Sequence, residues 1–200
     1  AGGTERIKKS MTCNEILNKL ETEYPADYAE DWDNPGLLAG RRDGTVQTVL
    51  VALDATEDVI EQAVRQHADL LITHHPLLFH GIRSVNDQDF IGRRLLTLIE
   101  NHIVCYAIHT NFDVLGMAEL NEKQRGLQNA RVLDITKETE NGTEGIGRIG
   151  EMKEPVSLRQ MAALVSVKMG VPSVRCYGPD DSDGSAHSVL VRRVAVCGGS

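Results

Sequence analysis

Short hydrophobic runs alternate with segments of helical periodicity along the first two thirds of the chain. Residues 45–54 (TVQTVLVALD) predict a strand, and Thr56 is placed to cap a helix with an apolar face. Residues 70–72 predict a second strand, 90–101 a second helix and 103–110 a third strand, which the helical segment 111–127 follows. This alternation predicts an α/β fold with a mostly parallel sheet and flanking helices.

An amphipathic helix is expected ahead of this sheet. Thr12-x-x-Glu15 has the sequence of a capping box and precedes an apolar stripe, and Pro25 marks the latest end of the helix. The following loop, residues 29–40 (AEDWDNPGLLAG), carries Trp32, the only tryptophan. Turn chemistry with a half-buried anchor and a loop that lines a site explain this segment equally well.

The pattern changes after residue 134. Residues 136–145 (TKETENGTEG) predict a polar linker, 145–152 a short strand, and Ser157-x-x-Gln160 a second capping box that opens a helix. Strands are predicted at 174–177 and 189–196. We assign residues 1–10 to a leader or expression remnant, 11–134 to a first α/β domain with the candidate site, and 135–200 to a second, incomplete α/β domain.

Composition narrows the classes of partner. The 200 residues carry a net charge of −8, which opposes broad binding to a nucleic acid backbone or an anionic membrane. The four cysteines include no C-x-x-C pair, and no segment has the pattern of a signal peptide or a membrane span. We therefore expect a reduced protein of the cytoplasm.

The polar residues with chemical potential follow the predicted parallel strands. Asp54 comes after the first strand, His74 and His75 after the second, and His109 with Asp113 after the third. Ligands of open α/β sheets bind outside the carboxyl ends of the strands. One edge of the sheet is therefore the expected site.

The pair His74-His75 is the strongest candidate for metal binding. Pro76 restricts His75 to extended geometry and ends the ladder, so we expect two imidazoles that lie close together but point apart. This arrangement suits two metal ions, with Asp113 as the carboxylate that bridges them. His109 is expected to bind substrate, transfer protons as a catalytic residue or orient a ligand.

Other polar features have simpler explanations. We interpret His67, His102 and His187 as ordinary core or surface residues, and His80 remains open between the two kinds of role. The acidic segment 179–184 lacks the ligand spacing of an EF-hand, so we expect a solvated loop. The glycines of GIGRIG lie inside a predicted strand, which argues against a nucleotide-binding turn.

Six segments carry a resemblance to a known family: EDWDNPGLLAG, ALDAT, LLITHHPLLF, AIHTNFD, GIGRIGEM and VAVCGGS. In order and spacing they resemble the dinuclear metal-centre family of GTP cyclohydrolase I type 2 homologues, over residues 11–200. The resemblance implies a two-domain subunit in a toroidal homohexamer. Its metal ligands would be His74, His75 and Asp113, with His109 beside them, for two divalent ions per subunit (Zn, Mn, Fe or Ni).

The family pattern also includes a later histidine followed after three residues by a bridging glutamate. No such element occurs up to Ser200, so we expect the chain to be a fragment. The implied activity is the metal-dependent ring-opening hydrolysis of GTP, a small-molecule substrate, with release of formate. A metal-dependent phosphoesterase and a non-catalytic metal-binding or regulatory hexamer are the alternatives.

Overall fold

A computed structural model describes residues 3–140, 142–178 and 190–198 of the chain. It divides into two compact units, Ala1–Phe112 and Asp113–Ser200. This division lies ahead of the boundary that composition suggested at residue 134, because the helical segment after Phe112 packs against a strand of the second unit. Each unit is described by itself.

The first unit contains a five-stranded sheet in the order β1 (Gly3–Thr12), β3 (Thr45–Ala52), β4 (Leu70–Thr73), β5 (Val104–Ala107) and β2 (Gly36–Ala39). The three central strands β3, β4 and β5 are parallel, as predicted, and the edge strands β1 and β2 are antiparallel to their neighbours. Residues 3–10, which we had set apart from the domains, supply most of β1.

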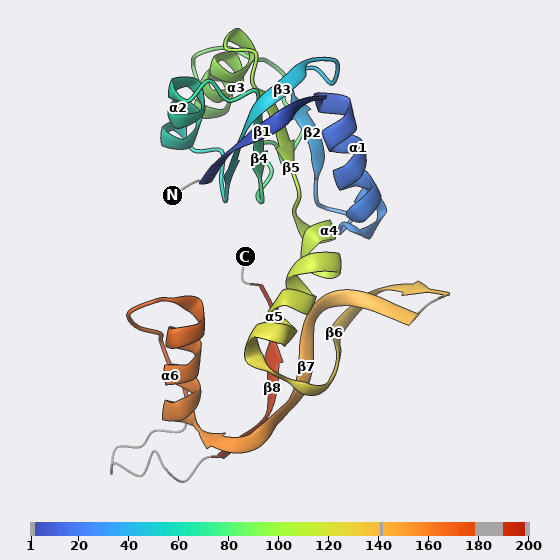
Figure 1. The fold of residues 1–200 in the computed structure, drawn as a ribbon, viewed down its shortest axis with the longest axis vertical. Coiled ribbons are helices and arrows are strands. Elements are labelled where there is room, and N and C mark those ends of the chain that lie inside the picture. Colours follow the sequence, from blue (N-terminus) through green and yellow to red (C-terminus); the bar gives the residue numbers. More distant parts are fainter. Residues whose placement is uncertain (1–2, 141, 179–189, 199–200) are drawn as a thin grey trace. The chain divides into compact units, whose positions relative to one another are not determined.

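Helices cover both faces of this sheet. Helix α1 (Cys13–Glu23) lies on one face, and α2 (Glu57–Arg65) and α3 (Phe90–Glu100) lie on the other (Figure 1). The predicted capping box of α1 is confirmed: Thr12 accepts from the Glu15 backbone, and Glu15 accepts from the Thr12 backbone. Thr56 caps α2, also as predicted. The short helices η1 (Ala26–Tyr28) and α4 (Thr110–Phe112) complete the unit.

The hydrophobic core has two layers because strand side chains alternate between the faces of the sheet. Leu70 packs with Leu17 of α1, whereas its neighbour Leu71 packs with Ile60 of α2 and Leu98 of α3. Cys105 is also fully buried in the layer under α2 and α3. Its thiol therefore acts as a small core side chain.

The second unit begins with the π-helix η2 (Asp113–Met117) and α5 (Ala118–Arg125). An antiparallel sheet follows, in the order β6 (Gln128–Thr139), β7 (Gly142–Ser157) and β8 (Leu190–Val196). Helix α6 (Leu158–Met169) starts at Ser157 with the predicted capping box. The predicted strand at 189–196 is confirmed over its described residues.

Two predictions for this unit are wrong. Residues 136–140 and 142–145 are not a linker but the arms of a long hairpin, in which Lys137 pairs with Glu144. Paired strands satisfy their backbone groups while polar side chains stay in solvent, so a polar sequence does not exclude a ladder. The segment 174–177 is irregular, without a ladder partner among the described residues.

Gly145 shows why β7 is rich in glycine. A Cβ atom at Gly145 would lie 1.9 Å from the carbonyl oxygen of Asp134 on β6. Only glycine therefore fits at this position, where the backbones of the two strands approach closely. The glycines of GIGRIG thus lie in a strand, as predicted. His187 and the acidic segment 179–184 lie outside the described residues.

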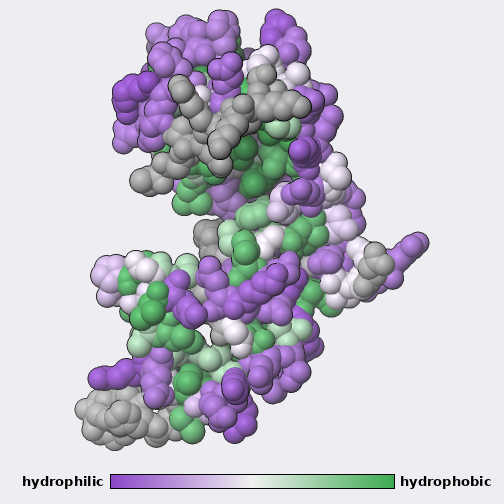
Figure 2. Space-filling model, viewed as in Figure 1, coloured by the Kyte–Doolittle hydropathy of each residue, from purple (hydrophilic) through white to green (hydrophobic). Residues whose placement is uncertain are grey.

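Helix α6 leaves apolar side chains at the surface. Val167 and Met169 are exposed, and Figure 2 shows hydrophobic residues gathered over this helix. An apolar groove of about 410 Å³ runs between α6 and the strands β7 and β8. Within residues 3–140, 142–178 and 190–198, no helix has both the length and the apolar character needed to cross a membrane.

Candidate metal centre

His74 and His75 follow β4 directly. The backbone N–H of His74 donates to the carbonyl of Ala52 at 3.3 Å, and that of His75 donates to Leu53 at 3.0 Å. The hydroxyl of Thr73 donates to the carbonyl of His75 at 2.9 Å, which closes a bend at the end of the strand. The side chains therefore leave a turn, and the alternation of a regular strand no longer applies to them.

Three imidazoles converge at this edge. Among the described residues, His74, His75 and His109 each place one coordinating nitrogen within 4.8 Å of the other two. The ring centroids of His74 and His75 are 4.9 Å apart, and that of His109 lies 5.1 and 5.3 Å from them. The histidine pair thus converges more than the strand pattern predicted, and His109 completes the cluster.

A hydrogen bond orients each of the three rings through Nδ1. The Nδ1 atom of His74 lies 3.0 Å from the carbonyl oxygen of Ile108, that of His75 lies 2.7 Å from Asp54 Oδ1, and that of His109 lies 2.8 Å from Asp33 Oδ1. All three partners are acceptors, so each Nδ1 carries the proton and Nε2 presents its lone pair. Metal-binding histidines in proteins usually have such an outer partner.

Asp33 forms the most buried part of the centre. Its side chain is fully shielded from solvent, and the backbone and hydroxyl of Thr110 both donate to its Oδ2. Burial raises the pKa of Asp33, but the hydrogen bonds from Thr110, His109 and Asn34 outweigh burial and hold the pKa below its usual range. A charged Asp33 therefore accepts the hydrogen bond of His109 Nδ1 and holds the ring in one orientation.

The backbone around His109 is also fixed. Its N–H donates to Asn111 Oδ1 at 3.0 Å, and Asn111 in turn donates to the carbonyl of Tyr24 at 2.7 Å. His109 is only 4% exposed. The ring is thus held in one orientation from both the main chain and the side chain.

An aromatic pair borders the cluster. The rings of Trp32 and Phe79 are stacked, with centroids 6.4 Å apart and an interplanar angle of 26°. Both meet His109 edge to face, each at 5.8 Å between centroids. Of the two explanations for the loop 29–40, the structure supports the one in which the loop lines the site.

The other predicted residues have varied positions. His80 is exposed and lies outside the histidine cluster. His67 and His102 take the left-handed conformation, with φ of 51° and 56°, just after the ends of α2 and α3, so their role is structural as expected. Asp113 is the first residue of η2 in the second unit. Its assignment as a metal ligand stays a prediction.

Two residues of the centre had no assigned role at the level of sequence. Asp54 follows the first parallel strand and His75 follows the second, and this shared position at the strand ends is the signal that could have linked them. Asp33 stood in the loop with Trp32, and its contact with His109 spans 76 positions. No local pattern in one sequence reveals such a contact.

A separate cavity of about 470 Å³ lies at the opposite ends of the strands. Val46 at the start of β3 and Val104 at the start of β5 line it, together with Cys13 and His102. Its lining includes none of the three clustered histidines. The cluster of His74, His75 and His109 therefore lies away from this cavity.

Comparison with known proteins places the chain. The sequence profile of the Duf34/NIF3 (NGG1p interacting factor 3) family matches residues 11–200. The chain belongs to the Duf34/NIF3 family. Proteins named GTP cyclohydrolase 1 type 2 homolog are similar to this NIF3-family chain: that of Clostridium perfringens is 31% identical over 95% of the chain, and that of Streptomyces coelicolor 34% identical over 94%.

Solved structures agree with this membership. A Staphylococcus aureus hypothetical protein, SA1388, is 28% identical with a TM-score of 0.80, over 96% of this chain and 73% of its own. A Bacillus cereus protein related to NIF3 shares the fold with a TM-score of 0.83 at 24% identity, over 96% of this chain and 78% of its own. The chain spans 70% of the length of the Clostridium relative and 65% of that of the Streptomyces relative.

Proposed function

We propose that this chain binds two divalent transition-metal ions at the centre formed by His74, His75 and His109, with Asp113 as a further ligand. The observation that carries the proposal is the set of three converging imidazoles, each with Nδ1 held by an acceptor. Neutral imidazole nitrogens suit Zn, Fe and Ni, and a carboxylate adds affinity for Mn. A zinc ion takes nitrogen ligands at about 2.0–2.1 Å, so two nitrogens on one ion lie at most about 4.2 Å apart. The three nitrogens lie within 4.8 Å of one another, so ring rotation would have to bring any wider pair closer before it could bind one ion.

The proposed activity is metal-dependent hydrolysis. A bound divalent ion would act as a Lewis acid and lower the pKa of a coordinated water. Asp54 and Asp33 would keep the rings of His75 and His109 in the tautomer that directs Nε2 to the centre. His109 would act either as a ligand or as the group that carries a proton to the substrate, and both roles use Nε2.

The proposed substrate is GTP, whose ring would open with release of formate. The names of the similar Clostridium and Streptomyces proteins support this proposal. A phosphoesterase or a non-catalytic metal-binding hexamer would use the same ligands. An assay for formate with GTP separates the first proposal from both alternatives.

We also propose that the protein assembles as a homo-oligomer, a toroidal hexamer by its resemblance to the family. The exposed apolar side chains of α6, such as Val167 and Met169, support self-association. A cytoplasmic location stays a prediction, with which the free Cys13, Cys105, Cys176 and Cys197 agree.

The central experiment measures bound metal. The purified chain is loaded separately with Zn, Mn, Fe and Ni, dialysed, and analysed by elemental mass spectrometry. We expect stoichiometric metal in the wild-type chain and in His80→Ala, whose side chain is outside the cluster, and a loss of metal in His75→Ala. Equal metal content in His75→Ala and the wild type would overturn the proposal. Formate production from GTP is then compared between the same variants.

A further inference from the structure

We propose that Trp32 and Phe79 form a stacking platform for a planar heteroaromatic ring of the substrate. This inference deepens the proposed function, because that function supplies the metal centre beside the platform. It assigns to these two side chains the recognition of a ring of purine type. Sugar and phosphate groups, which have no flat π-face, are expected to gain nothing from the pair.

The geometry places the platform at the histidine cluster. The two rings lie nearly parallel, and both contact the same imidazole, that of His109, at 5.8 Å between centroids. A ring stacked on either aromatic face would therefore have its edge close to the nitrogens of the cluster. This is the position in which a ring carbon could meet a water at the centre.

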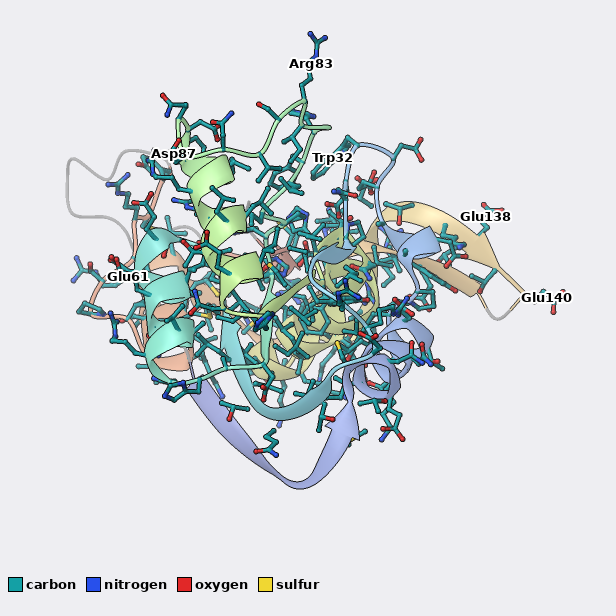
Figure 3. The ribbon with its side chains drawn as sticks, turned by 90° about the horizontal axis from the view of Figure 1, so that it is seen from above. Trp32, Glu61, Arg83, Asp87, Glu138 and Glu140 are labelled. Atoms are coloured by element: carbon teal, nitrogen blue, oxygen red, sulfur yellow. The ribbon has the colours of Figure 1, made fainter. Side chains whose placement is uncertain are left out.

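Neighbouring residues hold both aromatic side chains in place. The side chain of Asp33 is fully shielded and hydrogen-bonded, which fixes the loop just after Trp32. The Asn34 side chain donates to the carbonyl of Leu78 at 2.7 Å, which joins this loop to the residue before Phe79. Figure 3 shows Trp32 beside the loop that carries Arg83. The platform is thus organised before any ligand binds, which reduces the entropy lost on binding.

The exposure of the pair is the second observation. Trp32 is 58% exposed and Phe79 40% exposed, although tryptophan is on average among the more buried residues. Both rings are nearly perpendicular to the imidazole of His109, and each keeps a large part of its surface in solvent. Two adjacent exposed rings at the rim of a polar centre match the form of a small-molecule site, with apolar walls and a few converging polar groups.

The test uses the intrinsic fluorescence of Trp32, which is the only tryptophan in the chain. GMP is titrated into the chain with excitation at the red edge of the indole band, and ribose 5-phosphate serves as the ligand that lacks the ring. Free N-acetyltryptophanamide corrects for absorption by GMP. We expect saturable quenching by GMP and none by ribose 5-phosphate.

Three variants test whether GMP binding depends on Trp32 and Phe79. Phe79→Ala keeps the reporter and is expected to weaken GMP binding roughly 5- to 150-fold, because an aromatic side chain contributes that much to stacking on one base. Phe90→Ala removes a comparably exposed ring of α3 and is expected to bind GMP like the wild type. Binding to Trp32→Ala, measured by equilibrium dialysis, is expected to be weakened as well.

Repeating the titration with His75→Ala separates this inference from the proposed metal centre. Quenching by GMP that persists in metal-free His75→Ala supports the platform even if no metal binds the wild type. Normal metal binding with no GMP quenching overturns the platform alone. Equal quenching by GMP and ribose 5-phosphate, or unchanged GMP affinity in Phe79→Ala, also overturns it. Trp32 emission that responds to protein concentration but not to GMP would identify a subunit contact and reject the proposal.

Discussion

The Nδ1 atom of His109 lies 2.8 Å from the Oδ1 atom of Asp33, across 76 positions of sequence. This contact joins the loop before β2 to the end of β5 inside a shielded environment, since the two side chains are 5% and 0% exposed. A hydrogen bond between a carboxylate and a histidine sets which ring nitrogen presents its lone pair. The proposed metal affinity of the centre therefore depends on a residue that does not itself face the metal.

Replacement of Asp33 by Asn is expected to lower metal affinity roughly 10- to 100-fold. The amide can donate to Nδ1 and so favour the opposite tautomer, which places a proton on Nε2. Competition with a chromophoric chelator measures the affinity. Asp31→Asn, an exposed change of the same charge in the same loop, is the matched control and is expected to keep wild-type affinity. Equal affinities for the two variants would contradict this role of Asp33.

Asp54→Asn is expected to reduce metal affinity less than Asp33→Asn does. Asp54 lies 2.7 Å from His75 Nδ1, but its side chain is 48% exposed. Water can replace a lost partner at an exposed site, whereas a shielded site leaves the imidazole without one. The same chelator competition ranks the two variants. A larger loss in Asp54→Asn would show that exposure does not control the effect.

Stability is expected to fall at alkaline pH. Burial raises the pKa of Cys105 to about 12, and burial together with the charge of Glu21 raises the pKa of Tyr106 to about 12. Both groups are neutral when protonated, so the unfolded chain releases its protons first as pH rises. The stabilising contribution is complete below pH 9.0, the ordinary thiol value, and is lost towards pH 12.

Denaturant unfolding between pH 8 and pH 12 checks this alkaline dependence. Tyr106→Phe removes one of the two groups and is expected to flatten the fall in unfolding free energy. Tyr177→Phe changes a tyrosine that is 83% exposed and is expected to follow the wild-type curve. Indistinguishable pH profiles for Tyr106→Phe and the wild type would contradict the assignment.

Leu98→Ala is expected to lower the free energy of unfolding by about 2–5 kcal/mol, because it leaves a cavity in the core under α3. Leu98 is fully buried, whereas the next residue of the helix, Ile99, is 51% exposed. Ile99→Ala is therefore the control and is expected to change stability by less than about 1 kcal/mol. Chemical denaturation monitored by circular dichroism measures both. Similar losses of unfolding free energy in the two variants would contradict the assignment of Leu98, and not Ile99, to the core face of α3.

Local sequence patterns predicted the central architecture. The runs at 45–54, 70–72 and 103–110 became β3, β4 and β5, and both capping boxes formed as expected. These signals lie within one element and its ends, where neighbouring residues decide the outcome. The long hairpin of β6 and β7 was missed because its pairing depends on contacts between polar strands, which have no such periodic signature.

Part of the site was also predictable from local signals, because the ends of the parallel strands can be read from the sequence. His74, His75 and His109 were all placed at one edge of the sheet, and the structure brings them together. The contribution of Asp33 could not be inferred, since it arises from the packing of a loop against α4. The role of Trp32 was open at the level of sequence, because an exposed and a half-buried tryptophan look alike in a turn-rich segment.

The parallel pairing of β4 with β5 has a consequence for how the centre would take up an ion. Thr73 pairs with Ala107, so the histidines that follow both strands start from fixed neighbouring positions. Strands in a sheet lie about 4.7–4.9 Å apart, and this spacing sets the distance between the backbones that carry the clustered histidines. The apo-protein would then keep the pocket's shape, and ion capture would be limited by dehydration of the cation and not by refolding of the polypeptide.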